Sequence, residues 1–423
     1  MVQGNYKPEF QKIYDIFNDQ INSDYELGAG ISIEYKGELI VDLFGGFKSE
    51  SKTTKWTKDT LVNVWSVTKA VTGICILKLI SDDKLDVNKL VSDYWPEYGC
   101  NGKEDTRVID LLTHRAGMFG FQNGYPQSNW NDWDLYVDAL QNQMPFREPG
   151  TSQGYHAVTF GWLIGELIRK IDGRSVGKYF EDEFAKPLNL DFHIGLKEEN
   201  LNRCADVTYK KLDSIQPPIG FIKYVPNFIL NGSLKSFKNS IASNDFSKAF
   251  NSENFDKNNP NSVDWRTAEV PSANGHGTAR SLSKLFGTLS NLIEDNESII
   301  DKDVLKTAIE VHSSGPDTVL FGANLNFGYC FMVEQSFNQN INFAPILNTQ
   351  CYGHAGIGGS VAFGDLKNKI GYAFVCNRQQ KMKDLYKTSN LITKALYEIL
   401  AVSYTHLRAH ETGRNLVCRL LLE

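Results

Sequence analysis

The sequence predicts a mixed α/β (α+β) fold, in which one antiparallel sheet is built from both chain ends and flanked by helices. Two observations support this prediction. Strand-like segments occur near the N-terminus, at residues 31–43, and again near the C-terminus, at residues 328–377. The region between them, at about residues 66–310, shows mainly helical spacing of its apolar residues. We therefore expect a mainly helical insertion between the two halves of the sheet.

The composition is that of a globular chain with a large core. Of its 423 residues, 41% are hydrophobic and 12% are aromatic, which is sufficient for one large domain, placed here at residues 8–400. The 44 basic and 50 acidic residues form no long blocks and give a formal net charge of -6. We therefore expect neither nucleic acid nor an anionic membrane as a partner. A small molecule is the expected partner, and association into a homo-oligomer stays open.

Cysteine use and the N-terminal residues bear on the cellular compartment. The seven cysteines are scattered and contain no Cys-x-x-Cys pair, so we expect reduced thiols. The first residues contain no apolar signal core, and no run of about 18 apolar residues occurs. The sequence therefore predicts a cytoplasmic protein without a membrane span.

The N-terminal part predicts a helix, a hairpin and a second helix. Apolar residues recur at helical spacing between residues 8 and 22. Two alternating segments, 31–35 and 38–43, follow and are separated by Lys36-Gly37, which is typical of a β-hairpin. From Val67 onward, apolar residues recur at intervals of three and four, which predicts a buried helix.

The remaining elements are predicted in the same way from periodicity. Helical patterns occur at residues 108–113, 135–141, 160–171, 176–184, 279–293 and 383–400, and strand-like runs occur at residues 328–334, 360–364 and 370–377. Residues 213–265 are rich in Asn and Ser, with an apolar cluster at 219–230. We expect a loop or lid there, and the alternatives are ordinary core packing or a subunit contact. Residues 402–423 continue no periodicity and look like a translated sequencing artefact, so they are excluded from the fold prediction.

Ser66 and Lys69 are the strongest candidate for a reactive pair. Ser66 precedes the buried helix, where unpaired N–H groups and the helix dipole favour developing negative charge. Lys69 lies on the same helical face, and desolvation would lower the pKa of its amine until it could take the serine proton. The alternative is a capping serine beside a lysine that extends into solvent. The spacing Ser-x-x-Lys also occurs at Ser49, Ser81, Ser175 and Ser281, so spacing by itself is weak support.

Two glycine-rich stretches strengthen this interpretation. Residues 148–167 deliver Tyr155 just before another apolar helix, and residues 352–365 contain closely spaced glycines that lead into a strand. Together with Ser66-Val67-Thr68-Lys69, this order resembles the serine β-lactamases and penicillin-recognising enzymes, nearest to the class C β-lactamases and the esterases that share their fold. The phrases at residues 111–117 and 274–280 also resemble recurrent segments of that family. The resemblance covers about residues 8–400 and implies a β-lactamase/transpeptidase-like fold.

The resemblance also implies roles for individual residues. Ser66 would be the acylated nucleophile, Lys69 the group that activates it, and Tyr155 the proton shuttle to the leaving group. Because a phenol has a pKa of about 10, we expect positive charge on Lys69 to lower the pKa of Tyr155. The backbone N–H groups of Ser66 and Ile357 would hold the oxyanion.

Two departures from the family pattern concern substrate recognition. Where the family has Tyr-x-Asn, this chain has Tyr155-His156-Ala157, and His354-Ala355-Gly356 stands where many relatives have Lys-Thr-Gly. The resemblance implies substrate contacts for His354, Gly356 and His156. The missing amide and the conditional charge of His354 favour an esterase over an efficient β-lactamase.

Several functions stay open beside a serine hydrolase for small esters or amides. A transacylase or a weak β-lactamase would use the same mechanism. A non-catalytic assembly or scaffold module is the alternative of another class, although a scaffold has no need to retain Ser66, Lys69 and Tyr155 together. No metal, dinucleotide or nucleotide motif occurs, so we expect no cofactor and no metal.

Overall fold

The computed structural model of the protein describes residues 1–126, 129–209, 238, 244–250, 259–291, 299–335, 350–381 and 384–401. The apolar cluster at residues 219–230, predicted to belong to a lid, lies outside this set, as does the tail at residues 402–423. Within the predicted lid segment the structure describes helix α8 (Asp245–Phe250) and the start of helix α9 (Val263–Thr267).

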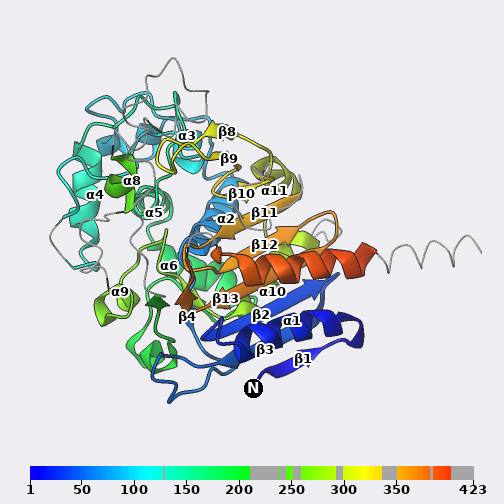
Figure 1. Ribbon diagram of the computed structural model, residues 1–423. Helices are drawn as coiled ribbons and strands as arrows, with labels where there is room; N and C mark the ends of the chain where they lie inside the picture. The colour runs from blue at the N-terminus through cyan, green and yellow to red at the C-terminus, as the bar shows by residue number, and fades with distance from the viewer. Residues whose placement is uncertain are drawn as a thin grey trace, which may run out of the picture.

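The main sheet joins the two ends of the chain. Among the described residues it has nine strands in the order β1-β3-β2-β13-β12-β11-β10-β9-β8. All neighbouring pairs in it are antiparallel, and the pairing of β13 with β2 brings the C-terminal strands beside the N-terminal ones (Figure 1). The predicted fold class is therefore confirmed. The strands are β1 (Gln3–Tyr6), β2 (Gly28–Tyr35), β3 (Glu38–Gly46), β8 (Ser313–Pro316), β9 (Asn324–Phe327), β10 (Met332–Val333), β11 (Cys351–Ala355), β12 (Val361–Asp365) and β13 (Ile370–Cys376).

The predicted hairpin is formed by β2 and β3. Lys36 and Gly37 have φ values of 52° and 79°, the left-handed conformation that a two-residue hairpin turn requires at both positions. Tyr35 pairs with Glu38 directly across this turn. The Lys36-Gly37 dipeptide therefore determines the register of the two N-terminal strands.

Helices cover both faces of the sheet because the side chains of each strand alternate between them. Ile31 and Ile33 of β2 pack in the cluster that contains Phe17 of helix α1 (Gln11–Asn22). Ser32 points the other way and accepts a hydrogen bond of 2.7 Å from Ser283 of helix α10 (Ala279–Asn291). A C-terminal helix at residues 387–401 lies beside α1 on the same face (Figure 1).

Helix α10 lies unusually close to strand β13. A Cβ atom placed on Gly371 of β13 would lie 2.1 Å from the carbonyl oxygen of Ser283 and 2.3 Å from the nitrogen of Gly287 in α10. Only glycine allows the two backbones to approach to this distance. The small residues of the sheet therefore determine how closely this helix packs.

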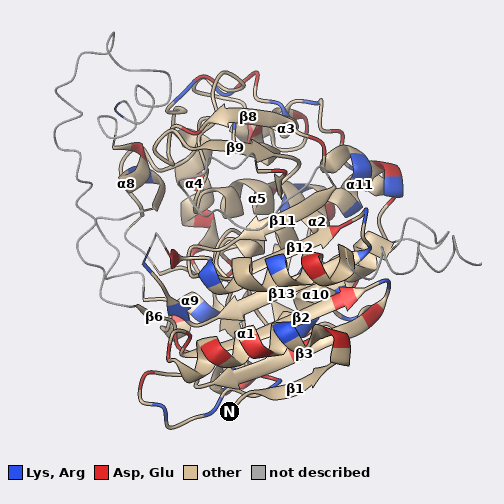
Figure 2. Ribbon diagram, turned by 45° about the vertical axis from the view of Figure 1, so that its right-hand side comes forward, with Lys and Arg blue, Asp and Glu red and all other residues tan. Residues whose placement is uncertain are grey.

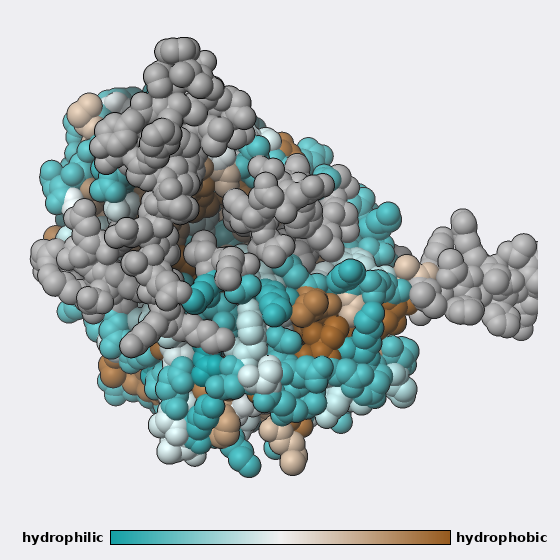
Figure 3. All heavy atoms as spheres, viewed as in Figure 1, coloured by the Kyte–Doolittle hydropathy of each residue, from teal (hydrophilic) through white to brown (hydrophobic). Residues whose placement is uncertain are grey.

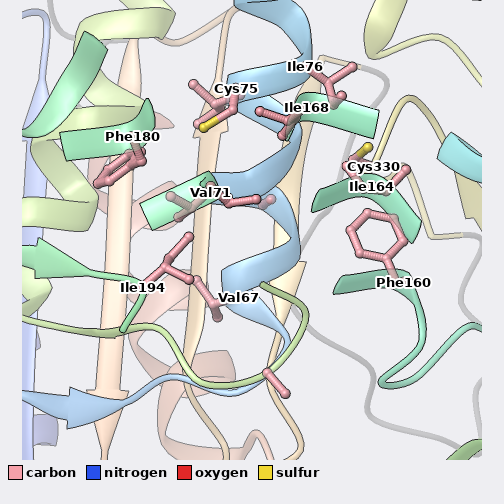
Figure 4. Packing of buried hydrophobic residues seen from close by; sticks show 14 of the residues in the cluster. Val67, Val71, Cys75, Ile76, Phe160, Ile164, Ile168, Phe180, Ile194 and Cys330 are labelled. Atoms are coloured by element: carbon pink, nitrogen blue, oxygen red, sulfur yellow. The ribbon is translucent and has the colours of Figure 1, made fainter. Parts of the chain in front are cut away.

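The helical insertion is organised around helix α2 (Val67–Ser81), which is buried on almost every side. Its residues Val67 and Val71 belong to the same core cluster as Phe160 and Ile164 of helix α5 (Phe160–Asp172) (Figure 4). The other helices of this region are α3 (Val108–Leu112), α4 (Trp133–Asn142), α6 (Val176–Phe180) and α11 (Lys302–Ala308). Small sheets are formed by β4 (Val62–Asn63), β7 (His276–Gly277) and β5 (Phe192–His193), and by β14 (Arg378–Gln379) with β6 (Thr208–Tyr209).

Short helical turns complete the described elements. They are η1 (Pro8–Phe10), η2 (Val91–Asp93), η3 (Pro96–Tyr98), the π-helical turn η4 (Glu181–Ala185) and η5 (Glu198–Arg203). The helix predicted at residues 176–184 thus ends as an α-helix at Phe180 and continues with π-helical hydrogen bonding.

Some strand predictions were wrong or incomplete. The run at residues 328–334 is not one strand, because Cys330 has a φ of 64° and the chain turns there between β9 and β10. Strands β1, β8, β9 and β11 of the main sheet were not predicted. Their sequences are short or rich in polar residues and glycine, and they are strands because a neighbouring strand supplies their hydrogen bonds.

The described surface carries both signs of charge. Basic and acidic residues are interspersed along the ribbon in Figure 2, and the described surface seen in Figure 3 is mainly hydrophilic. No helix in the described ranges is long and apolar enough to cross a membrane. The six described cysteines form no disulfide.

Candidate active site

Ser66 lies at the N-terminus of α2, as predicted, in a strained turn after β4. The preceding residue, Trp65, has a φ of 52°, a conformation that is rare for a bulky side chain and costs about 1–3 kcal/mol. Ser66 occupies the N-cap position, but its side chain makes no capping hydrogen bond. The alternative of a purely capping serine is therefore wrong, and the hydroxyl is left for other contacts.

The segment around Gly275 is hydrogen-bonded to this turn. The Val64 N–H donates to the Gly275 carbonyl at 2.9 Å, and the Gly275 N–H donates to the Thr68 hydroxyl at 2.8 Å. That hydroxyl donates in turn to the Trp65 carbonyl at 2.6 Å. Three hydrogen bonds therefore hold the residues on both sides of Ser66.

Lys69 is completely buried and its amine faces Ser66. The Lys69 Nζ lies 3.3 Å from the Ser66 Oγ, 2.7 Å from the Ala157 carbonyl oxygen and 2.9 Å from the Ser272 carbonyl oxygen. The alternative of a lysine extending into solvent is therefore wrong. Burial lowers the pKa of Lys69 well below its usual value, because an ammonium would lose its hydration there.

Tyr155 lies next to the same serine. Its ring centroid lies 4.9 Å from the Lys69 Nζ. Burial raises the pKa of Tyr155 above its usual value of 10, and the nearby Ser66 side chain lowers it by less. The expectation that the pKa of this phenol is lowered is therefore wrong, because burial of the phenol outweighs the influences that lower its pKa.

The loop after β11 packs directly on the Ser66 turn. A Cβ atom placed on Gly356 would lie 2.4 Å from the Val64 carbonyl oxygen and 3.4 Å from the Ser66 nitrogen. Glycine is therefore needed at position 356, because the two backbones approach too closely for a side chain. Within the described residues, the N–H groups of Ser66 and Ile357 have no hydrogen-bond acceptor.

His354 and His156 are both buried beside these groups and both have a pKa of about 3, mainly because of burial. The His354 Nδ1 bonds to the Ala355 carbonyl at 2.8 Å, and its Nε2 has no partner in the described part of the chain. The His156 Nε2 accepts a hydrogen bond of 3.0 Å from the Met118 N–H. This backbone contact gives His156 a structural role that needs no substrate. Substrate contacts of His156 and His354 therefore stay predictions.

Two residues next to Tyr155 were not singled out from the sequence as site residues. His114 and Asp317 are buried and accept hydrogen bonds from the backbone around Tyr155. His114 belongs to the family-like phrase at residues 111–117, which was the available signal. Asp317 directly follows strand β8, and nothing in its sequence context connects it with Tyr155. No group of three or more His, Cys, Asp or Glu side chains that could hold a metal occurs among the described residues.

Comparisons with known proteins agree on one family. The family described as Beta-lactamase matches residues 17–396. The esterase/beta-lactamase LipL of Mycobacterium tuberculosis is 28% identical over 387 residues, which are 89% of this chain and 83% of LipL.

Two crystal structures extend the similarity to the fold. A penicillin-binding protein homologue from Caulobacter crescentus has a TM-score of 0.78 and 30% identity, over 94% of this chain and 100% of that one. A family VIII carboxylesterase has a TM-score of 0.79 and 28% identity over the same shares. The chain belongs to the beta-lactamase family and is a serine hydrolase.

Proposed function

We propose that the protein hydrolyses small esters through an acyl-enzyme on Ser66. The observation that carries this proposal is the set of contacts of the Lys69 Nζ. A neutral amine has two N–H groups and one lone pair. With the two N–H groups donated to the carbonyls of Ala157 and Ser272, the lone pair faces the Ser66 hydroxyl. Lys69 then accepts the Ser66 proton as the hydroxyl attacks.

The attack places negative charge on the carbonyl oxygen of the ester. We assign the backbone N–H groups of Ser66 and Ile357 as its donors, because neither has an acceptor among the described residues. The N-terminus of α2 adds the favourable end of a helix dipole. Such preorganised donors are worth about 10²–10³ in turnover.

Tyr155 is proposed to act as an acid in the first step. Burial keeps its phenol protonated, and the phenol lies near the Ser66 side chain. In the tetrahedral intermediate the leaving oxygen is bound to the same carbon atom as the Ser66 Oγ, so the phenol is also near the leaving group. It gives its proton to the leaving alkoxide, and the ammonium formed on Lys69 returns a proton to the phenolate. Water then attacks the acyl group in the reverse sequence of proton transfers, which releases the acid and restores Ser66.

The charge of the site favours an uncharged substrate. His354, where the family pattern has a lysine, is neutral at ordinary pH because burial holds its pKa at about 3. His156-Ala157 lacks the amide that holds the side chain of a β-lactam. A penicillin would therefore lose both its carboxylate partner and its amide partner. The names of LipL and of the family VIII carboxylesterase are consistent with ester hydrolysis.

A fluorophosphonate probe tests the nucleophile. We expect stoichiometric labelling of the wild-type protein and none of Ser66→Ala, whereas Ser49→Ala, in another Ser-x-x-Lys sequence, should label normally. Folded protein that does not label would contradict the proposal and favour the scaffold alternative. Turnover of p-nitrophenyl acetate far above that of a chromogenic cephalosporin is expected, and the reverse order would identify a β-lactamase. Product analysis with added alcohol separates hydrolysis from acyl transfer.

A further inference from the structure

Two distant residues hold the backbone on both sides of Tyr155. The Gly154 N–H donates to the His114 carbonyl at 2.9 Å, and the His156 N–H donates to the His114 Nδ1 at 3.2 Å. Between them, the Tyr155 N–H donates to the Asp317 Oδ1 at 3.2 Å. Three consecutive N–H groups are thus held by two residues, which are 203 positions apart from each other in the sequence.

Each of these two residues is itself held in place. Asp317 is fully buried, and its Oδ1 also accepts from the N–H groups of Val319 and Leu320, each at 2.9 Å. The His114 ring lies 4.7 Å from the Phe327 ring and 4.8 Å from the Tyr155 ring, measured between centroids. The same imidazole therefore contacts both the backbone and the ring of the tyrosine segment.

The bonding of His114 requires one tautomer. Because its Nδ1 accepts the His156 N–H, the ring proton of neutral His114 must be on Nε2. Burial lowers the pKa of His114 well below its usual value, so the ring is neutral in the site. His114 also has a φ of 60°, a conformation that asparagine and glycine adopt more readily than other residues.

We propose that His114 and Asp317 are positioning residues, which hold residues 154–156 so that the Tyr155 side chain stays beside Lys69 and Ser66. This inference rests on the proposed proton transfer by Tyr155. Both act through the backbone: Asp317 accepts from the Tyr155 N–H, and His114 accepts from the N–H groups of the neighbours Gly154 and His156. A displacement of about 1 Å in a proton-transfer group lowers turnover about 10²-fold, which is the size of effect expected on losing either contact.

The test compares two substitutions at position 114, both by residues that readily adopt a positive φ. His114→Asn keeps an acceptor near the position of Nδ1, whereas His114→Gly removes it. We expect His114→Gly to lower kcat for p-nitrophenyl acetate about 10²-fold with little change in KM, and His114→Asn to recover most of that loss. The matching pair at the second position is Asp317→Ala, which should lose activity, and Asp317→Asn, which keeps an Oδ1 acceptor.

The same variants are then measured with Tyr155→Phe, in which no phenol is left to position. We expect His114→Gly and Asp317→Ala to cause little further loss there, because residues that act as a unit are not additive. Equal losses with and without the Tyr155 phenol would overturn the inference and leave only a structural role. If Tyr155→Phe alone left kcat unchanged, the proposed function itself would fall, and the inference with it. Far-UV circular dichroism and melting temperatures identify variants that do not fold.

Discussion

Burial controls the charge of Lys69. The amine has no exposed surface and its pKa is lowered well below 10.5, so the neutral form is more accessible than in a solvated lysine. Its acceptors are two backbone carbonyl oxygens, from Ala157 and Ser272, rather than a carboxylate. These acceptors orient the amine without supplying the negative charge that would stabilise an ammonium. The amine is therefore suited to accept a proton.

A first prediction concerns the pH dependence of turnover. Because the neutral amine is the active form, kcat should rise with pH through the lowered pKa of Lys69 and reach its plateau well below pH 10.5. Lys69→Arg should lower kcat about 10²–10⁴-fold at every pH, since a guanidinium stays charged and cannot accept a proton. Steady-state kinetics of p-nitrophenyl acetate from pH 5 to pH 10 provide the measurement.

The matched control is Lys52→Arg, because Lys52 occupies the same position in another Ser-x-x-Lys sequence but is exposed. It should retain the wild-type profile. Appreciable turnover by Lys69→Arg, or a profile of the wild type that is flat over the whole range with chemistry rate-limiting, would exclude Lys69 as the base.

At the scale of single elements, two backbone approaches determine the geometry around α2 and the sheet. The loop after β11 meets the Ser66 turn at Gly356, and helix α10 meets β13 at Gly371. Both contacts leave no space for a side chain. A glycine of the loop after β11 therefore determines how closely that loop approaches the Ser66 turn, and a glycine of β13 determines how closely α10 approaches the sheet.

A second prediction follows for Gly356. In Gly356→Ala the new methyl group would lie 2.4 Å from the Val64 carbonyl oxygen, so the loop must move away from Ser66. Displacing the Ile357 N–H should lower kcat about 10²-fold. In the control Gly30→Ala, the methyl group meets Ala279 at an ordinary contact distance of 3.5 Å. Unchanged kcat in folded Gly356→Ala would contradict the assignment of Ile357.

A third prediction concerns the contact between β2 and α10. Burial raises the pKa of Glu34 to about 7, and Gly287 of α10 lies against its carboxyl group. The folded state therefore binds a proton more tightly than the unfolded state, whose pKa is near 4.5. The contribution of Glu34 to the stability is full below pH 4.5 and is lost as the pH rises to about 7.

Glu34→Gln should remove this part of the pH dependence. We expect its melting temperature to exceed that of the wild type above pH 7 and the difference to shrink towards pH 5. Thermal unfolding at several pH values measures this, with Glu38→Gln, an exposed position on the same hairpin, as the control. An equal pH dependence in Glu34→Gln and wild type would contradict the raised pKa.

At the scale of the whole molecule, the fold depends on contacts between its two ends. Strand β13 pairs with β2 over residues 370–376, and the helix at residues 387–401 packs on the same face as α1. The Lys12 and Glu398 side chains form an ion pair of 2.7 Å across these two helices. Neither half of the sheet is complete without the other, so we expect folding to be cooperative.

A fourth prediction tests this closure by truncation. A chain that ends at residue 368 lacks β13 and the last helix, and should not fold, because β2 and β12 would each lose a partner strand. A chain that ends at residue 401 should keep the melting temperature and esterase activity, since the sequence predicts no structural role for the tail. Circular dichroism and activity measure both chains. A folded product from the shorter chain would contradict the dependence on end-to-end pairing.

The sequence by itself determined the features that depend on local geometry. The spacing of Val67, Val71 and Ile74 predicted a buried helix, and a helix places Lys69 on the same face as Ser66 whatever surrounds it. The Lys36-Gly37 turn likewise specified the β2–β3 hairpin. Most helices were predicted well, because their periodicity is a property of neighbouring residues.

The tertiary structure decided what depends on distant parts of the chain. The hydrogen bonds of β1, β8 and β11 come from other strands, so their own sequences contain little signal. The lowered pKa of Lys69 was predicted from its apolar neighbours and is confirmed. The pKa of Tyr155 is raised, not lowered as predicted, because the surrounding segments exclude water from its phenol completely. The contact of Asp317 with Tyr155 joins residues 162 positions apart. Such contacts depend on how whole elements pack, and no spacing in the sequence specifies that packing.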